Sequence, residues 1–344
     1  MPREIVHWLV LERCTERLSE SDATAAATAL KTHRSAAYLG AIAHDAPYYY
    51  RLGADHAFSQ IAEAIHGRFG QDTFEPIRTM AADILHSPDS ERGALWAFLL
   101  GMVSHYAADV VFHPLVFYFT GDYYDPDPKQ RTKARARHRL LEVYLDSWFH
   151  QYIETWNKGK ISAVLNSLDN TFPRITELLE ANCNTDFVPE NVREPESDSN
   201  LDDRWERSFW HMAKLQELFF SAPVGFVMRQ LNTLTFGMLN EYDALCSYSR
   251  RKPNKFFEQR LEFHNPIDQA TITATVNELL DAAVEDCTAL FTMFEPLISG
   301  KSKDVGAALS ITGKSLSMGL EHVAPETKRH FSESGLPLPG LKIS

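Results

Sequence analysis

Apolar residues recur at intervals of three and four along most of the 344-residue chain, which is the spacing of one face of an α-helix. Runs that alternate between apolar and polar residues, as in a half-buried strand, are not convincing anywhere. The segments that we expect to be helical are 5–18, an Ala-rich segment that ends at 33, 36–43, 58–66, 75–85, 91–119, 138–156, 205–249 and 268–297. The pattern therefore predicts an all-α protein.

Breaks in this pattern divide the chain into four parts. Residues 1–183 form the first helical domain. Residues 184–204 are acidic and punctuated by proline, which is the composition of a linker or a mobile loop. Helical patterns resume over 205–300, and we expect this extension to pack on the first domain. Residues 301–344, with scattered Gly, Ser and Pro, are expected to form a loosely ordered tail.

Two further breaks lie inside the first domain. Pro47 follows Asp45 closely and ends or redirects the chain there. Residues 121–128 form a turn-rich loop, and Lys129–Arg137 is a basic stretch that leads into the helix expected over 138–156.

Composition narrows the class of protein. The net charge of −12 argues against a general nucleic-acid-binding protein, although a nuclease that holds phosphate through metal ions is not excluded. The four cysteines lie far apart, as buried free thiols of a reducing compartment do. The N-terminus has no signal-peptide pattern, and the longest apolar stretch carries polar groups that are costly in a membrane. We therefore expect a cytoplasmic protein without a transmembrane segment.

That longest apolar stretch carries His105, Asp109 and His113 at four-residue steps. On a helix each such step rotates by about 40°, so the three side chains project from one face. His138 and Glu142 repeat the one-turn step. Imidazole nitrogens and carboxylate oxygens are the donor set of zinc, with iron and manganese as the other candidates. A buried hydrogen-bond network is the alternative interpretation of the first three residues.

Two residues nearer the N-terminus fit the same chemistry. His7 interrupts an apolar run, and Asp45 ends an apolar segment just before a turn. Asp45 could present its carboxylate to a pocket or cap the turn. His44 precedes Asp45, and we expect it to point elsewhere. The aromatic residues that could line an apolar mouth, or equally pack in the core, are Trp8, Tyr48, Tyr49, Tyr50 and Phe69.

In this order these residues resemble the zinc-dependent phospholipase C family and, more distantly, the fungal single-strand nucleases. The most specific element is Gly101-Met-Val-Ser-His105-Tyr-Ala-Ala-Asp109, followed by the His138–Glu142 pair. The matching elements run from His7 to Glu142, and residues beyond about 180 find no recognised counterpart. The resemblance implies a multi-helix bundle of the phospholipase C and nuclease type with additional C-terminal helices.

The resemblance also implies a cluster of two or three zinc ions, with other divalent transition metals as alternatives. The first ion would be held by Asp45, a histidine downstream of it, His105 and Asp109. The second would be held by His113, His138 and Glu142. The third would be held by His7 and Asp109, so that Asp109 bridges two ions. The downstream histidine is His66, which ends a helical pattern, or His56.

Two features depart from the family pattern. In the secreted members the mature amino terminus also supplies ligands, whereas no cleavage is evident here, so the third ion could be absent, weakly held, or completed by Met1 or water. A long insert, Pro114–Arg137, separates His113 from His138. Its aromatic and basic residues could form a flap that faces the substrate, or a plain surface excursion.

Together these features predict a zinc-dependent phosphodiester hydrolase of phospholipase C type, because clustered divalent ions neutralise phosphate oxygens and lower the pKa of water. Asp45 is the expected catalytic residue, as ligand, orienting group or general base. The expected substrate is a phospholipid or another phosphodiester, and no stable nucleic-acid complex is expected. The alternatives are a nuclease or nucleotidase on the same scaffold and a non-catalytic, metal-stabilised helical protein.

Overall fold

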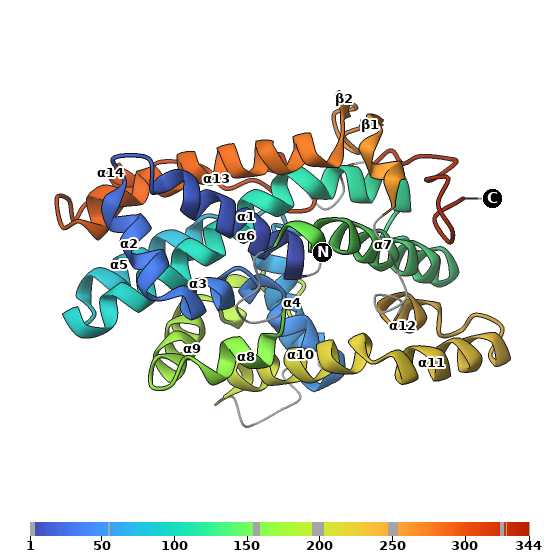
Figure 1. Ribbon diagram of the computed structural model, residues 1–344, viewed down its shortest axis with the longest axis horizontal. Helices are drawn as coiled ribbons and strands as arrows, with labels where there is room; N and C mark the ends of the chain where they lie inside the picture. Colours follow the sequence, from blue (N-terminus) through green and yellow to red (C-terminus); the bar gives the residue numbers. More distant parts are fainter. Residues whose placement is uncertain are drawn as a thin grey trace.

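The computed structural model describes residues 4–53, 56–153, 159–194, 203–246, 254–323, 327 and 329–343 (Figure 1). Its α-helices are α1 (Glu4–Leu18), α2 (Thr24–Thr32), α3 (Arg34–Gly40), α4 (His56–Ile65), α5 (Glu75–His86), α6 (Asp89–Thr120), α7 (Pro128–Phe149), α8 (Ile161–Asn166), α9 (Thr171–Asn182), α10 (Arg204–Phe220), α11 (Ala222–Leu234), α12 (Asn240–Leu245), α13 (Val276–Ile298) and α14 (Val305–Ala308). The 3₁₀ helices are η1 (Ala43–Gly53), η2 (His150–Tyr152), η3 (Thr185–Phe187) and η5 (Lys255–Glu258). The strands β1 (Leu261–His264) and β2 (Thr271–Ala274) form one antiparallel pair. The expectation of an all-α protein is confirmed.

Helix α6 is the centre of the fold. The helices α1, α2, α3, α5, α7 and α13 all contact it. Because neighbours surround it, its sequence is apolar on nearly every face. Of the helices in the described ranges, α6 alone is long and apolar enough to span a membrane, yet 94% of its most apolar window is buried inside the protein. That burial is what a core helix of a folded domain shows.

The crossing of α3 and α6 depends on two glycines. A Cβ atom on Gly101 would overlap the carbonyl oxygen of Ala37, and one on Gly40 would overlap that of Phe98. The two backbones are therefore in direct contact. Gly40 ends α3 and Asp45 follows in η1, so this close approach brings Asp45 toward the polar face of α6.

Polar contacts fix α1 against its neighbours. Asp146 on α7 accepts hydrogen bonds from the backbone N–H groups of Ile5 (3.4 Å) and Val6 (3.3 Å), which have no partner within the helix. The indole N–H of Trp8 donates to the carbonyl oxygen of Tyr38 on α3 (2.9 Å). These contacts set the position of the first turn of α1.

The segment before α13 differs from the sequence-based expectation. The helix expected from Asp268 is wrong at its start, because Thr271–Ala274 form β2 and the helix begins after Thr275. Thr275 and Glu278 form a capping box, which is a strong start signal. The β-branched residues Thr271, Ile272 and Thr273 favour a strand instead.

Residues after 300 extend along the body of the protein. Leu309, Leu316 and Leu341 are fully buried in the same hydrophobic core as α1, α6 and α13. The sequence suggested a loosely ordered tail; the described part of this segment packs into the core.

Three other helix boundaries differ from those expected from the sequence. The basic stretch Lys129–Arg137 is itself helical, because α7 begins at Pro128 with Asp127 accepting from the Lys129 N–H. That helix ends at Phe149, before the expected Trp156, and residues 154–158 lie outside the described part of the chain. The helix expected over 205–249 is divided into α10, α11 and α12. Of the linker expected over 184–204, residues 195–202 lie outside the described ranges.

Gly101→Ala is expected to destabilise the protein by about 1–3 kcal/mol, because the added methyl group forces α3 and α6 apart. Helix propensity alone would give the opposite sign, since Ala is the better helix former by about 1 kcal/mol. Urea unfolding measures the difference. Gly306→Ala in α14, where a Cβ meets only a side-chain oxygen at 3.6 Å, is the matched control. Equal stability of Gly101→Ala and wild type would contradict the backbone contact.

Candidate metal centre

Buried histidines and carboxylates from five elements meet at the middle of α6. The side chains come from α1 (His7), η1 (His44 and Asp45), the end of α4 (His66), α6 (His105, Asp109 and His113) and α7 (His138 and Glu142). None of them exceeds 4% exposure, so the cluster is almost fully shielded from water. All eight residues singled out from the sequence as ligands are brought together here.

Asp109 lies at the centre of the cluster. One of its carboxylate oxygens is 3.6 Å from Nε2 of His7. The other is 3.1 Å from Nε2 of His105 and 3.6 Å from Nε2 of His66. Nδ1 of His113 lies 3.5 Å from that same oxygen. The carboxylate therefore contacts imidazoles from three different helices and is placed to serve more than one cation.

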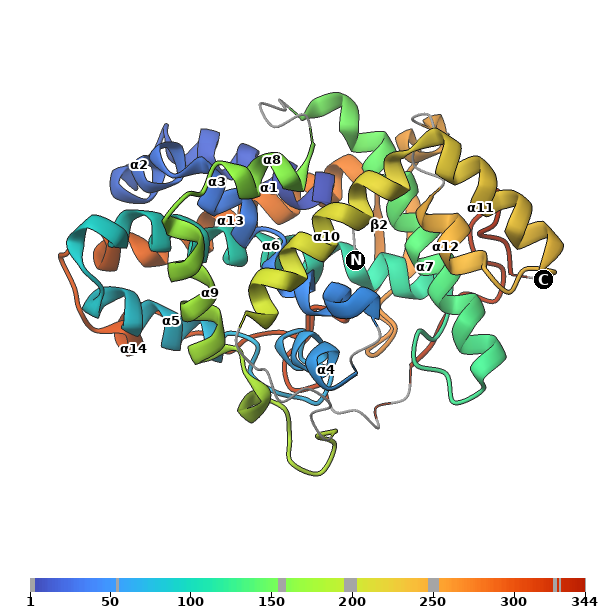
Figure 2. The same cartoon turned by 90° about the horizontal axis from the view of Figure 1, so that it is seen from below.

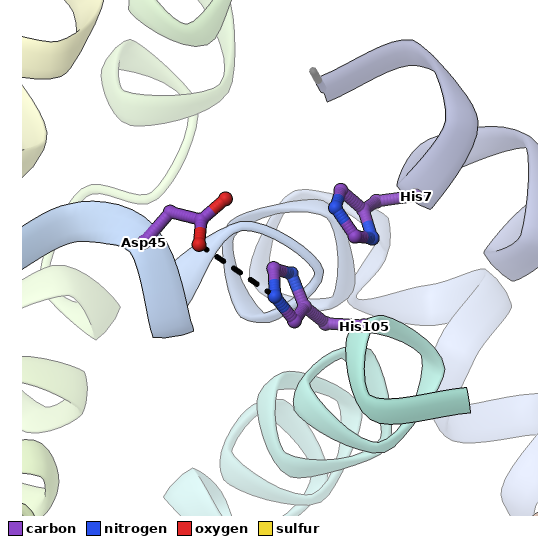
Figure 3. Close-up of side chains that lie close together, drawn as sticks. All are labelled: His7, Asp45 and His105. Carbon is purple, nitrogen blue, oxygen red and sulfur yellow. Dashed lines mark ion pairs between the residues drawn. The ribbon is translucent and has the colours of Figure 1, made fainter. Parts of the chain in front are cut away.

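His7, Asp45 and His105 form the first group of donors (Figure 3). One donor atom from each lies within 4.8 Å of the other two. The rings of His7 and His105 are stacked at 3.9 Å between centroids, and Asp45 Oδ1 is 3.7 Å from His105 Nε2. Figure 3 shows the carboxylate of Asp45, on η1, directed toward the ring of His105 on α6.

Two further groups meet the same criterion. His66, His105 and Asp109 form one, and Asp45 Oδ1 lies 3.3 Å from Nε2 of His66 beside it. His113, His138 and Glu142 form the other, in which Nε2 of His138 is 2.9 Å from Glu142 Oε1. The latter group has the composition that the resemblance implies for the second ion. Of the two candidate histidines downstream of Asp45, His66 is the one that lies beside Asp45 in the cluster. The side chain of the alternative, His56, lies outside the described residues.

Backbone carbonyls orient three of the imidazoles. Nδ1 of His105 donates to Ala41 (2.9 Å), that of His66 to Ala62 (2.6 Å) and that of His113 to Leu316 (2.9 Å). A carbonyl oxygen can only accept, so each ring carries its proton on Nδ1. The Nε2 atoms of the three rings then face the cluster. This outer hydrogen bond is the arrangement that metal-ligating histidines use.

The ionisation of the cluster favours a bound cation. Burial lowers the pKa of His7, His44 and His138 well below the usual value, so these rings are neutral. Burial likewise lowers the pKa of His113 to about 3. These neutral rings add lone pairs to the site and no positive charge.

Asp109 stays charged. Burial would raise the pKa of Asp109, but the nearby imidazoles of His113, His105 and His66 hold it well below its usual range. Burial would lower the pKa of His66, yet the nearby carboxylates of Asp109 and Asp45 raise it to about 9. The carboxylates thus concentrate negative potential at His66 Nε2.

Unsatisfied polar atoms test whether the donor set fits zinc. Within the described part of the chain, Nε2 of His7, His105 and His113 and both oxygens of Asp109 are buried without a hydrogen-bond partner. Among those residues no Lys or Arg pairs with Asp109 or Asp45. Buried groups of this kind are costly unless an ion satisfies them. Nitrogen and carboxylate oxygen donors without thiolates suit zinc and related divalent ions, so the residues fit the metal.

His44 is a member of the cluster that the sequence reading placed wrongly. It is 1% exposed, its ring stacks on His105 at 4.6 Å, and it meets His66 edge to face at 5.8 Å. We expected it to point away from the site. In the 3₁₀ segment η1, His44 and Asp45 instead flank the same ring, that of His105.

A pocket of about 30 Å³ opens on the cluster. It is lined by Tyr48, His66, His113, Phe117, Tyr123, Tyr124, His138, Arg139 and Ser317. Of the aromatic residues proposed for a mouth, Tyr48 lines it, whereas Trp8 and Tyr50 are buried in the core and Tyr49 and Phe69 pack against it. Tyr123 and Tyr124 belong to the Pro114–Arg137 insert, so part of this insert faces the site.

The fold and the donor set define a helical protein with a candidate multinuclear metal centre. A family model for zinc-dependent phospholipase C matches residues 6–215, more than half of the chain. The chain therefore belongs to the zinc-dependent phospholipase C family. The match extends into α10, beyond the His7–Glu142 region that contains the motifs. No curated protein and no solved structure matches the chain.

Asp109→Asn is expected to lower the bound zinc to less than half of the wild-type content. The reason is that a neutral amide then replaces the charged carboxylate at the centre of the imidazoles. Elemental analysis of the purified protein after reconstitution measures the ratio. Asp281→Asn on the exposed side of α13 removes the same charge elsewhere and is the control. Wild-type metal content in Asp109→Asn would show that this carboxylate is not a ligand.

Chelation is expected to lower the melting temperature by about 5 °C or more, because it leaves buried carboxylates without a cation. Thermal unfolding with and without a chelator, followed by re-addition of Zn²⁺, measures the shift and its reversal. A melting temperature that stays constant after verified metal removal would count against the metal centre.

Proposed function

We propose that the protein is a metal-dependent phosphodiester hydrolase of phospholipase C type, with water activated by a cluster of two or three zinc ions. The observation that carries the proposal is the gathering of three buried donor groups close to Asp109, beside an aromatic-lined pocket. Membership of the family supports the same activity.

The metal-holding residues follow from the donor groups. His7, Asp45, His66, His105 and Asp109 would hold the ions on one side of the centre, and His113, His138 and Glu142 the ion on the other. When bound, such ions neutralise phosphate oxygens and lower the pKa of water toward neutrality. The carbonyl groups of Ala41, Ala62 and Leu316 keep the histidine Nε2 atoms aimed into the centre.

Asp45 is the residue that we propose moves the proton. Its Oδ1 atom lies between His66 and His105, at 3.3 Å and 3.7 Å from their Nε2 atoms, and it accepts no hydrogen bond from a described group. A carboxylate held there can orient a water molecule and accept its proton while the phosphodiester bond is attacked. Asp109 is more deeply enclosed by imidazoles, which suits a bridging ligand instead.

The pocket walls explain how a phosphodiester would be held. Arg139 supplies the positive charge that a phosphate requires, and Phe117, Tyr123 and Tyr124 supply an apolar wall for the attached groups. The volume of about 30 Å³ is small for a phospholipid headgroup, so we expect these aromatic side chains to shift when a substrate binds.

Asp45→Asn is expected to lower kcat by about 100-fold or more on a phospholipid substrate, because the amide cannot accept a proton. Release of the phosphorylated headgroup from mixed micelles measures turnover, with metal content determined on the same samples. Asp281→Asn is the control for loss of one carboxylate.

Three outcomes would overturn the proposal. Turnover confined to single-stranded nucleic acid or nucleotides would reassign the protein to the nuclease type. Two or more bound ions with no turnover on any phosphodiester would leave a metal-stabilised scaffold. Fewer than one bound ion per chain after reconstitution would remove the centre itself.

A further inference from the structure

Large apolar side chains are exposed on one part of the protein. Apart from Tyr152, every exposed large apolar side chain in the described ranges lies between Leu218 and Tyr242. We call this set the apolar surface; its members are Leu218, Phe226, Val227, Leu231, Leu234, Phe236, Met238 and Tyr242. Most of them belong to α11 and to the turn that follows it. Of the residues of α11, Gly225 alone is buried. Exposed patches of this kind mark interaction sites.

The aromatic side chain of Phe236, in the turn after α11, points into solvent, and its backbone is strained. Phe236 is 99% exposed, and its φ angle of 52° lies in the left-handed region. That conformation costs a non-glycine residue on the order of 1 kcal/mol. An isolated, strained and fully exposed phenyl ring adds nothing to the stability of this chain, which indicates a role outside the core.

The charge of the apolar surface is unusual for this protein. Residues 221–239 contain one charged residue, Arg229, and no carboxylate, although the chain has a net charge of −12. Nearby, the first half of α7 carries only positive charge. Its cations are Lys129, Arg131, Lys133, Arg135, Arg137 and Arg139, and residues 128–141 contain no Asp or Glu.

These two features lie at the same end of the molecule. Helix α12 packs on α7 and also contacts α11. In both Figure 1 and Figure 2 the beginning of α7 and the end of α11 lie toward the same side. The basic helix also continues to the candidate metal centre, because His138 and Arg139 line its pocket. An apolar surface, a basic helix and the pocket mouth are thus connected through α7.

We propose that the apolar surface and the first half of α7 dock the protein on a bilayer that contains anionic phospholipid. Exposed Phe, Leu and Met side chains insert at the boundary between headgroups and acyl chains, while Lys and Arg side chains meet the lipid phosphates. In a symmetric dimer formed through this surface the same cations would face one another and repel, whereas the phosphates of anionic lipid attract them. The choice of a lipid surface rests on the proposed function, which places a phospholipid at the pocket that α7 reaches.

Two variants separate the apolar and the electrostatic contributions. Phe236→Gly removes the exposed ring and relieves the left-handed strain, so it is expected to retain or raise stability while weakening membrane binding by about tenfold or more. Lys129→Glu with Lys133→Glu is expected to weaken binding by a similar factor, because each basic residue near an anionic surface contributes about 1 kcal/mol.

Sedimentation with vesicles is the measurement. The full-length protein is mixed with vesicles of phosphatidylcholine alone or with about 30% phosphatidylserine, at low salt and at about 0.5 M NaCl. We expect binding to the anionic vesicles and weaker binding at high salt. Lys301→Glu with Lys303→Glu changes the charge equally near α14, at the other end of the molecule, and is expected to bind as wild type does (Figure 1).

The Asp45→Asn variant keeps this test separate from the activity. Vesicle binding by Asp45→Asn at the wild-type level would support the docking surface even if no turnover is found. No binding of wild type to anionic vesicles, or equal binding by Phe236→Gly and wild type, would overturn the proposal. A dimer in light scattering that Phe236→Gly dissolves, without vesicle binding, would assign the surface to a second copy.

Discussion

The charge of Asp109 in the middle of an apolar helix is the constraint on which the site depends. The carboxylate is fully buried, and the imidazoles around it are kept neutral or compete for a proton. Enclosing an ionised carboxylate in this way costs several kcal/mol unless a cation compensates it. A divalent metal ion satisfies the carboxylate and the imidazole lone pairs together. Metal binding and stability of the folded core are therefore linked through one residue.

The scaffold holds the donors in place from distant parts of the chain. Gly40 and Gly101 allow α3 and α6 to touch, which sets Asp45 beside His105. Asp146 on α7 caps the start of α1 and so positions His7, whereas the carbonyl of Leu316 orients His113. The centre thus needs both the matched family region and the segment after 300, which explains why that segment is packed into the core.

Spacing on single helices was enough to predict much of the site. His105, Asp109 and His113 lie one turn apart on α6, and His138 and Glu142 repeat this on α7, so helical periodicity places each set on one face. These are local relations, and no tertiary information is required to see them. The helical class followed from the same periodicity.

Contacts between side chains on different elements could not be predicted from helical spacing. His44 joins the cluster through ring contacts with His105 and His66, which lie on other elements and which the apolar pattern around it does not reveal. Arg139 and Tyr124 reach the pocket only through the packing of α7 against the rest of the fold. The β1–β2 hairpin was missed because its strands are four residues each, too short for an alternating pattern. The arrangement of side chains around Asp109 is therefore partly local and partly tertiary in origin.

The distribution of charge connects the buried centre with the exterior. The chain is acidic overall, yet α7 begins with cations alone and ends with Glu142 and Asp146 inside the protein. An acidic body with one basic end has a directional field, which orients that end toward an anionic surface. The same helix carries positive charge from the surface to Arg139 at the pocket. Further along, it carries negative charge from the pocket inward to the candidate metal centre. An anionic phosphodiester and a divalent cation would each meet the charge that it requires along a single helix.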